Sequence, residues 1–129
     1  MPDGNPKYKK RPRPESIQFF KDCMQSKAVV SSTEEVEDLV FVVKRGKGDL
    51  RVRLTNIYIV GEADVIEILA ESRPVNAIVT VAPYNSYTSE AKAYALREGV
   101  GLFTMKEFNG AVFHAGPKFL AYKPKKARP

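Results

Sequence analysis

Five cationic side chains stand within ten residues of one predicted β-hairpin, and cations of this kind bind phosphate groups. Leu50, Val52 and Leu54 alternate with two arginines, which places both arginines on one face of a strand. Residues two apart on a strand are separated by about 7 Å, close to one nucleotide's backbone repeat. Against Asp49, the five cations give the hairpin a net charge of +4. The hairpin cations are Lys44, Arg45, Lys47, Arg51 and Arg53.

Three tyrosines are candidates for stacking on bases. Tyr58 follows the hairpin, and Tyr84 and Tyr87 occupy a polar loop after a buried strand, where α/β sheets commonly place binding sites. A base stacks on such a ring with roughly 1–3 kcal/mol whatever its identity. A duplex hides its bases, so the pattern favours single strands. The alternative is that the cations form the solvated side of an antiparallel sheet and that the tyrosines pack over core edges.

Residue types that could perform catalysis are scarce. His114 is the single histidine and is interpreted as a surface or packing residue, and Cys23 as a small buried hydrophobe. Two such residues are too few for a zinc site, and Gly46-Lys47-Gly48 lacks the length of a P-loop. The sequence therefore predicts no catalytic residue, no metal and no cofactor. A cluster of carboxylates is interpreted as a solvated helix face, namely Glu34, Glu35, Glu37 and Asp38.

Most of the basic charge stands near the two ends of the sequence. Residues 1–14 carry a net +4 and residues 118–129 a net +5, so the part between them is mildly acidic. Proline-studded basic segments bury little apolar surface, and their cations can meet nucleic-acid phosphates. The alternative is a pair of solubilising tails, or a linker at the C-terminal end. The pattern predicts a basic tail at 1–14, a single domain at 15–117 and a second basic tail at 118–129.

Length and composition exclude several classes of protein. The 129 residues fit one domain, and a single cysteine excludes a disulfide-stabilised scaffold. Apolar runs such as residues 39–43 are too short to cross a membrane, and the start of the sequence lacks the apolar stretch of a signal peptide. We therefore expect a cytoplasmic protein without a membrane partner.

The apolar pattern predicts an α/β (α+β) fold in which an antiparallel hairpin joins a βαβ unit. Pro14 opens a helix that runs to about residue 27, and Ser32-Thr33-Glu34-Glu35 has the capping-box form of a short helical turn. Residues 57–60 either prolong the second hairpin strand or form a new one. The other expected strands are 39–44, 50–55, 77–82 and 100–104. The other expected helices are a stripe over Val65, Ile66 and Leu69, residues 89–98 with Gly99 at the C-cap, and a last helix through Phe113 that begins with a capping box of Thr104 and Glu107.

The second half carries four short segments in a recognisable order, namely Ala77-Ile78-Val79-Thr80, Thr88-Ser89-Glu90-Ala91, Tyr94-Ala95 and Val100-Gly101-Leu102-Phe103. With Val42-Val43-Lys44-Arg45 upstream, this order resembles Mrr-type restriction-endonuclease-like domains over about residues 38–113. The resemblance implies that fold. In the family, an acidic or amide residue at the position of Val42 helps to hold the catalytic metal. Because valine cannot bind a metal, the resemblance implies the fold without a complete active site.

Two other resemblances concern the same chain. The BRCT pattern competes for the second half, although its glycine-rich turn is absent here. Lys7-Tyr8-Lys9-Lys10-Arg11 and the basic-aromatic hairpin at 41–53 are similar to ThermoDBP-type proteins of hyperthermophilic archaea. This similarity implies binding of single-stranded DNA and a thermophilic archaeal source, with which two glutamines, one histidine and one cysteine are compatible. A homodimer is left open.

These observations predict a non-catalytic domain that binds single-stranded DNA with little sequence preference, with RNA left open as a partner. The hairpin cations would follow the backbone, and the tyrosines would stack on bases. One alternative is a degenerate metal-dependent nuclease with Asp38, Asp49 and Lys44 near its site. The other is a protein-interaction module of a larger assembly, which would dock through its βαβ half.

Overall fold

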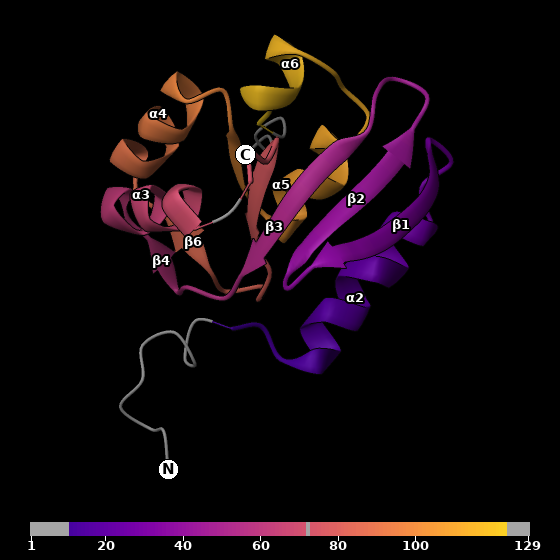
Figure 1. Cartoon of the computed structure of the whole chain (residues 1–129), viewed down its shortest axis with the longest axis horizontal. Helices are drawn as coiled ribbons and strands as arrows, with labels where there is room; N and C mark the ends of the chain where they lie inside the picture. The colour runs from indigo at the N-terminus through magenta and orange to yellow at the C-terminus, as the bar shows by residue number, and fades with distance from the viewer. Residues whose placement is uncertain (1–10, 72, 124–129) are drawn as a thin grey trace, which may run out of the picture.

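A mixed sheet of five strands organises the computed structural model, which describes residues 11–71 and 73–123 (Figure 1). Its first three strands are antiparallel and its last three are parallel, with the third strand shared between the two halves. The predicted fold class, a single α/β domain with an antiparallel hairpin joined to a βαβ unit, is confirmed. In order across the sheet, the strands are β1 (Val30–Glu37), β2 (Val40–Arg45), β3 (Leu50–Thr55), β5 (Ala77–Thr80) and β7 (Gly101–Thr104).

The first strand corrects a prediction. Residues 32–35 were expected to form a helical turn, and this was wrong, because they lie within β1 and pair with β2. Ser32 stands opposite Lys44, and Glu34 stands opposite Val42. A capping box needs an apolar helical face after it, and residues 30–37 offer none, so ladder hydrogen bonds to β2 prevail. The carboxylates near residues 34–38 therefore belong to an edge strand and its turn rather than to a helix face.

The predicted hairpin is confirmed. Strands β2 and β3 pair with Val40 opposite Arg53 and Val43 opposite Leu50. The turn between them uses Gly48 at φ 116°, a conformation that glycine adopts without steric cost. Phe41 on β2 is fully buried.

Two helices connect the parallel strands, as expected. Helix α3 (Glu62–Glu71) lies between β3 and β5, and α4 (Ser89–Arg97) lies between β5 and β7. The Thr88 side chain caps α4, and Gly99 at φ 76° follows its end. The predicted stripe on α3 is wrong at Ile66, which is exposed, because the helix turns Ile68 to the core in its place.

Residues 57–60 form a new strand rather than prolonging β3. Strand β4 (Ile59–Val60) pairs in parallel with β6 (Ser86–Tyr87), a strand within the loop that was expected to be irregular. This two-stranded sheet fastens the segment after β3 to the segment after β5.

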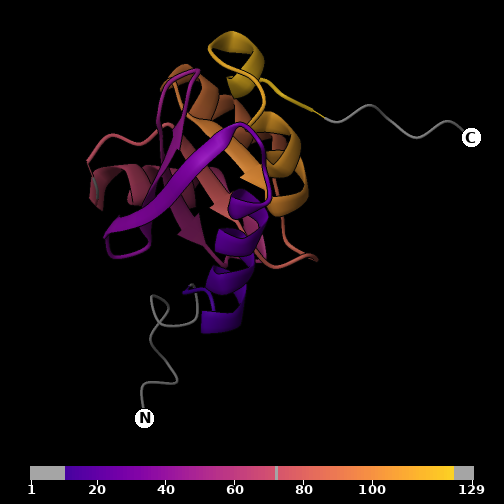
Figure 2. The ribbon, with the colours of Figure 1, turned by 90° about the vertical axis from the view of Figure 1, so that its right-hand side faces the viewer.

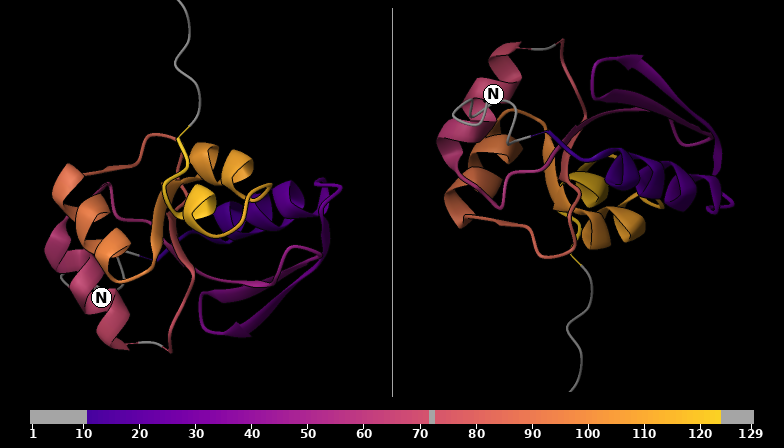
Figure 3. Two further views of the ribbon diagram at one scale, coloured as in Figure 1. Left: turned by 90° about the horizontal axis from the view of Figure 1, so that it is seen from above. Right: turned by 90° about the horizontal axis from the view of Figure 1, so that it is seen from below.

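The sheet is covered on both faces. Helices α2 (Pro14–Gln25), α5 (Met105–Ala111) and α6 (Pro117–Leu120) lie along one face, and α3 and α4 lie on the other (Figures 2 and 3). On the first face the fully buried rings of Phe20, Phe41 and Phe108 pack with centroid distances of 5.4 and 6.0 Å from Phe20. The predicted capping box of Thr104 and Glu107 is present at the start of α5.

The C-terminal part of the fold extends beyond residue 117. Residues 118–123, which the sequence analysis assigned to the basic tail, contribute to α6 and the turn after it. Phe119 is 3% exposed, and its ring centroid lies 5.2 Å from that of Phe103. Phe119 is therefore part of the core. The predicted tail residues 1–10 and 124–129 lie outside the described residues.

Candidate nucleic-acid interface

Arg51 and Arg53 share one face of β3, as the alternation predicted, and each faces a carboxylate. Arg51 forms an ion pair with Glu37 of β1, and Nη1 of Arg53 lies 3.6 Å from Oε1 of Glu71 at the end of α3. Exposed Arg73 also approaches Glu37, at 3.8 Å. The arginine face of the hairpin is therefore largely neutralised within the molecule.

Part of this neutralisation comes from β1, the strand that was expected to be a helical turn. Glu37 stands opposite Val40, which stands opposite Arg53, so all three side chains project from the same face of the sheet. Glu34 reaches the same face opposite Val42, whose other neighbour is Arg51. The hairpin has a strongly positive net charge when only its own residues are counted. Together with the facing carboxylates of β1 and α3, however, this surface is mixed in charge.

Arg45 serves the fold. The residue is 7% exposed, and its guanidinium donates to the carbonyl oxygens of Gly48 at 2.7 Å and of Val112 at 2.6 Å. It also donates to the His114 carbonyl and lies over the Phe119 ring, 5.6 Å from the centroid. Burial lowers the pKa of Arg45 from its ordinary value. Arg45 therefore fastens the hairpin to the segment between α5 and α6.

Lys44 and Lys47 keep exposed side chains. Lys44 projects from β2 opposite Ser32. Lys47 lies in the hairpin turn and donates from Nζ to the Phe113 carbonyl at 2.8 Å. Of the five predicted cations, these two present the most open ammonium or guanidinium groups.

Tyr58 and Tyr84 form an exposed aromatic pair. Their ring centroids are 6.1 Å apart, with 51° between the ring planes. Tyr58 is 63% exposed and Tyr84 is 70% exposed. The β4–β6 pairing brings them together, because the backbone N–H of Ser86 donates to the Tyr58 carbonyl at 2.8 Å. Segments 26 residues apart in sequence thus present two neighbouring rings to solvent.

A buried hydrogen-bond network holds the backbone under this pair. The Thr80 hydroxyl donates to the Ile57 carbonyl at 2.8 Å. It therefore accepts from Nδ2 of Asn85, 2.9 Å away, and the same amide donates to Oδ1 of Asn56 at 3.0 Å. Asn85 is 5% exposed and adjoins Tyr84 in the chain. The network fixes the loops that carry both tyrosines.

Tyr87 has a structural partner instead of an open ring. Its hydroxyl donates to the Glu107 carboxylate, 2.8 Å from each oxygen, and its ring lies 5.5 Å from the Lys92 ammonium. Burial and the bond to Glu107 raise the pKa of Tyr87 above its ordinary value. Lys92 is itself 7% exposed and donates to the Leu102 carbonyl at 2.7 Å, and burial lowers its pKa to about 8.

The first described residues run along the edge of the sheet where β3 ends (Figure 1). Arg11 forms a two-bond ion pair with Asp38 in the turn between β1 and β2, with distances of 2.6 and 2.9 Å. The Arg11 guanidinium holds the pKa of Asp38 below its usual value. Arg13 is exposed just before α2. The first described residues therefore bring the basic side chains of Arg11 and Arg13 to this part of the molecule.

The candidate catalytic groups are dispersed. Asp38 and Asp49 lie at opposite ends of β2, and a six-residue strand spans about 20 Å. The His114 ring stacks on Tyr122 with centroids 5.2 Å apart, and Cys23 packs half-buried against the core. No group of three or more histidine, cysteine or acidic residues that could hold a metal ion occurs within residues 11–71 and 73–123.

Comparison with known proteins adds no relative. No family model, no curated protein and no solved structure matches this chain. Over the described part of the chain, the helices are too short and too polar to span a bilayer.

Proposed function

We propose that this chain binds single-stranded nucleic acid without catalysis and with little sequence preference, with DNA as the primary partner. The observation that carries the proposal is the exposed Tyr58–Tyr84 pair. Two neighbouring rings offer π-faces to successive bases, and stacking of this kind accepts every base. The rigid backbone beneath the rings favours binding, because little order has to be gained when a strand docks.

The distribution of charge supports the same edge. The chain carries a net +6, which attracts a polyanion. Lys106 is exposed just after the end of β7, Arg13 is exposed just before α2, and Lys7, Lys9 and Lys10 precede Arg13 in the sequence. We therefore assign the backbone contacts mainly to this edge, with Lys44 and Lys47 of the hairpin in a minor role. Arg45, Arg51, Arg53 and Tyr87 are left out of the proposed interface because they have partners within the fold.

The alternatives receive less support. A nuclease site that uses both Asp38 and Asp49 would need the two carboxylates to meet, and β2 separates them. A protein-interaction module would bind its partner through apolar contacts, and such binding would survive high salt, whereas phosphate contacts would not. Binding measurements at two salt concentrations separate these cases.

A fluorescence-anisotropy titration of the full chain tests the proposal. Labelled strands of about 20 nucleotides would be compared as single-stranded DNA, duplex DNA and single-stranded RNA, each at two salt concentrations. We expect the single strands to bind more tightly than the duplex and the affinity to fall as salt rises. Equal affinity for the duplex, or no binding to any of the three, would contradict the proposal.

A matched pair of variants locates the interface. We expect Tyr84→Ala to weaken single-strand binding about 5- to 100-fold, in line with the loss of one stacked base. Tyr94→Ala on α4 is the control and should change the affinity less than twofold, because that ring packs on Arg97 and against the core beneath α3 and α4. Equal affinities of the Tyr84 variant and the wild type would show that the Tyr58–Tyr84 pair is not part of the interface.

A further inference from the structure

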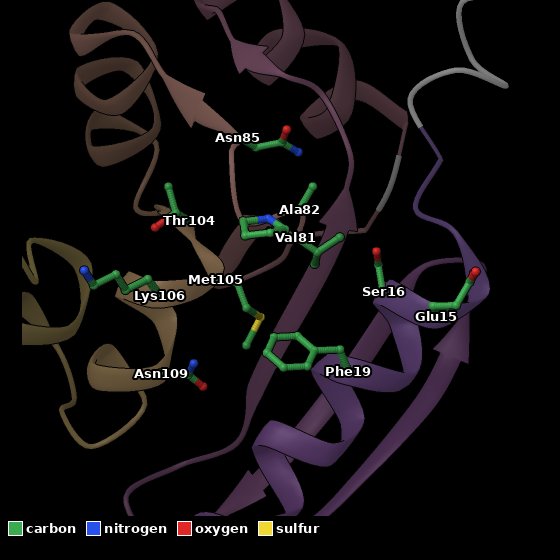
Figure 4. A pocket seen from close by; sticks show the side chains of 11 residues that line it. Glu15, Ser16, Phe19, Val81, Ala82, Asn85, Thr104, Met105, Lys106 and Asn109 are labelled. Atoms are coloured by element: carbon green, nitrogen blue, oxygen red, sulfur yellow. The ribbon is translucent and has the colours of Figure 1, made fainter.

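A pocket of about 520 Å³ opens beside the segment that carries Tyr84, since Pro83 and Asn85 both line it (Figure 4). Three parts of the chain line it, namely the first turns of α2, the segment that follows β5 and the beginning of α5. The volume falls within the range of about 300–1,000 Å³ that is usual for small-ligand sites. The pocket lies where the parallel strands β5 and β7 end, the edge at which α/β sheets commonly bind ligands.

The walls of the pocket suit a flat apolar group. The ring of Phe19 comes from α2 and lies beside the Met105 side chain from α5, with Val81 and Ala82 next to them (Figure 4). Phe19 is 54% exposed, although it is a large apolar residue on a helix that is otherwise anchored by buried Phe20 and Met24. An exposed aromatic ring beside a thioether forms a surface on which a planar ring can pack.

Two asparagines add polar groups to the wall of this pocket, namely Asn85 and Asn109. The Asn85 amide is held by hydrogen bonds to Thr80 and Asn56. The Oδ1 atoms of both asparagines are covered by protein and have no hydrogen-bond partner among the described residues. The pocket therefore combines apolar side chains with amide groups, which can hydrogen-bond to donors or to acceptors.

The pocket is continuous with the proposed interface. Pro83 and Asn85 line it, and Tyr84 stands between them in the chain with its ring exposed. Glu15 and Ser16 line the opposite side, two and three residues after the exposed Arg13. The exposed Lys106 lies at the pocket as well. A strand whose bases stack on the tyrosines would therefore pass the mouth of the pocket between the Lys106 cation and the Glu15 carboxylate (Figure 4).

We propose that this pocket receives one unpaired nucleobase of the bound strand, with its ring against Phe19 and Met105. A nucleobase fits these features, since it is planar, largely apolar on its faces and carries hydrogen-bonding groups at its edge. A base in a duplex is paired and stacked, so only a single strand can offer one. The inference rests on the proposed function and adds a binding site for one base next to the Tyr58–Tyr84 pair.

Photo-crosslinking tests the proposal on the wild-type full chain. A single-stranded DNA that contains 5-iodouracil would be irradiated in the complex, and mass spectrometry would identify the residues that become linked. We expect links to Phe19 or Met105 as well as to Tyr58 or Tyr84. Links confined to the two tyrosines would overturn the pocket while leaving the proposed function in place.

A pair of variants adds a quantitative test. Phe19→Ala should weaken single-strand binding about fivefold or more, whereas Phe113→Ala, at a ring that is 40% exposed elsewhere, should change it less than twofold. Thermal unfolding would check that both variants fold. If Tyr84→Ala weakens binding but Phe19→Ala equals the wild type, the pocket proposal is wrong and the function stands. If the wild type binds no single strand, both proposals fail.

Discussion

The β2–β3 hairpin and the edge that carries Tyr58 and Tyr84, the tyrosine edge, both have the residue types of a nucleic-acid surface. The molecule uses these two regions differently. In the hairpin, Arg45, Arg51 and Arg53 have partners within the fold. At the edge, Tyr58 and Tyr84 are exposed and contact mainly each other. The comparison teaches that residue type alone does not mark a binding surface. What distinguishes the two regions is whether the polar or aromatic group has already been satisfied by the fold.

The largest effect that we expect comes from Arg45→Met. The change leaves the carbonyls of Val112 and His114 without their donor, and bonds from a charged donor are worth about 1.5–3 kcal/mol each. We therefore expect a loss of about 4 kcal/mol in the free energy of unfolding, measured with urea. Single-strand affinity, measured where the variant is folded, should change less than twofold. A small loss of stability with a large loss of affinity would reverse the roles assigned to the two regions.

The next effect concerns Lys92, whose ammonium group lies over the Tyr87 ring. Its pKa is about 8 in the folded protein and about 10.5 in an unfolded chain, so the unfolded state binds more protons between these values. Burial of the charged lysine thus penalises folding below pH 8, and the penalty disappears as the pH rises to about 10.5.

Urea unfolding of the wild type and Lys92→Met from pH 7 to pH 10.5 measures this penalty. The stability of the wild type relative to the variant should rise by about 3 kcal/mol across that range. Titrations shared by both proteins cancel in the difference. A flat difference would show that Lys92 keeps its ordinary pKa in the fold.

Two tyrosines in the same loop allow a smaller and sharper contrast. Tyr87→Phe removes the hydroxyl that donates to Glu107 and should cost about 1–2 kcal/mol of stability without weakening single-strand binding. Tyr84→Phe should leave both quantities unchanged, because the exposed ring remains. Denaturant titration and anisotropy on the two variants provide the check. A binding defect in Tyr87→Phe would place that hydroxyl in the interface.

The smallest effect is expected from Glu37→Gln. This change removes the carboxylate that faces Arg51 and Arg73, so it adds one positive charge to the hairpin face. If the hairpin has only a minor role, the affinity for single-stranded DNA at low salt should rise less than about threefold. A tenfold or greater increase in affinity would show that the hairpin face binds nucleic acid and that Glu37 of β1 weakens this binding.

Local signals made much of the fold predictable from the sequence. The hairpin, the buried strand β5, the capping box at Thr104 and the left-handed Gly99 after the C-cap of α4 each depend on residues a few positions apart. Strand β1 was missed because its polar residues carry no apolar alternation, and its pairing with β2 decides its structure.

The site was less predictable, because it depends on distant partners. Tyr58 and Tyr84 were identified singly, but their adjacency arises from the β4–β6 pairing across 26 residues. Arg45 resembled its neighbouring cations in sequence, and its carbonyl partners lie 67 and 69 residues away. Phe19 was absent from the predicted site because nothing local distinguishes an exposed phenylalanine on an amphipathic helix from a buried one.

The position of β1 at the margin of the sheet has a consequence for self-association. The outermost strand leaves one row of backbone N–H and C=O groups without a neighbouring strand, and such a row can pair with another chain. Charged side chains discourage this pairing, and β1 carries Glu34, Glu35 and Glu37 along its length. Two copies approaching edge to edge would bring these carboxylates together. The glutamates of β1, one of which pairs with Arg51 of the hairpin, therefore also oppose the growth of the sheet into aggregates.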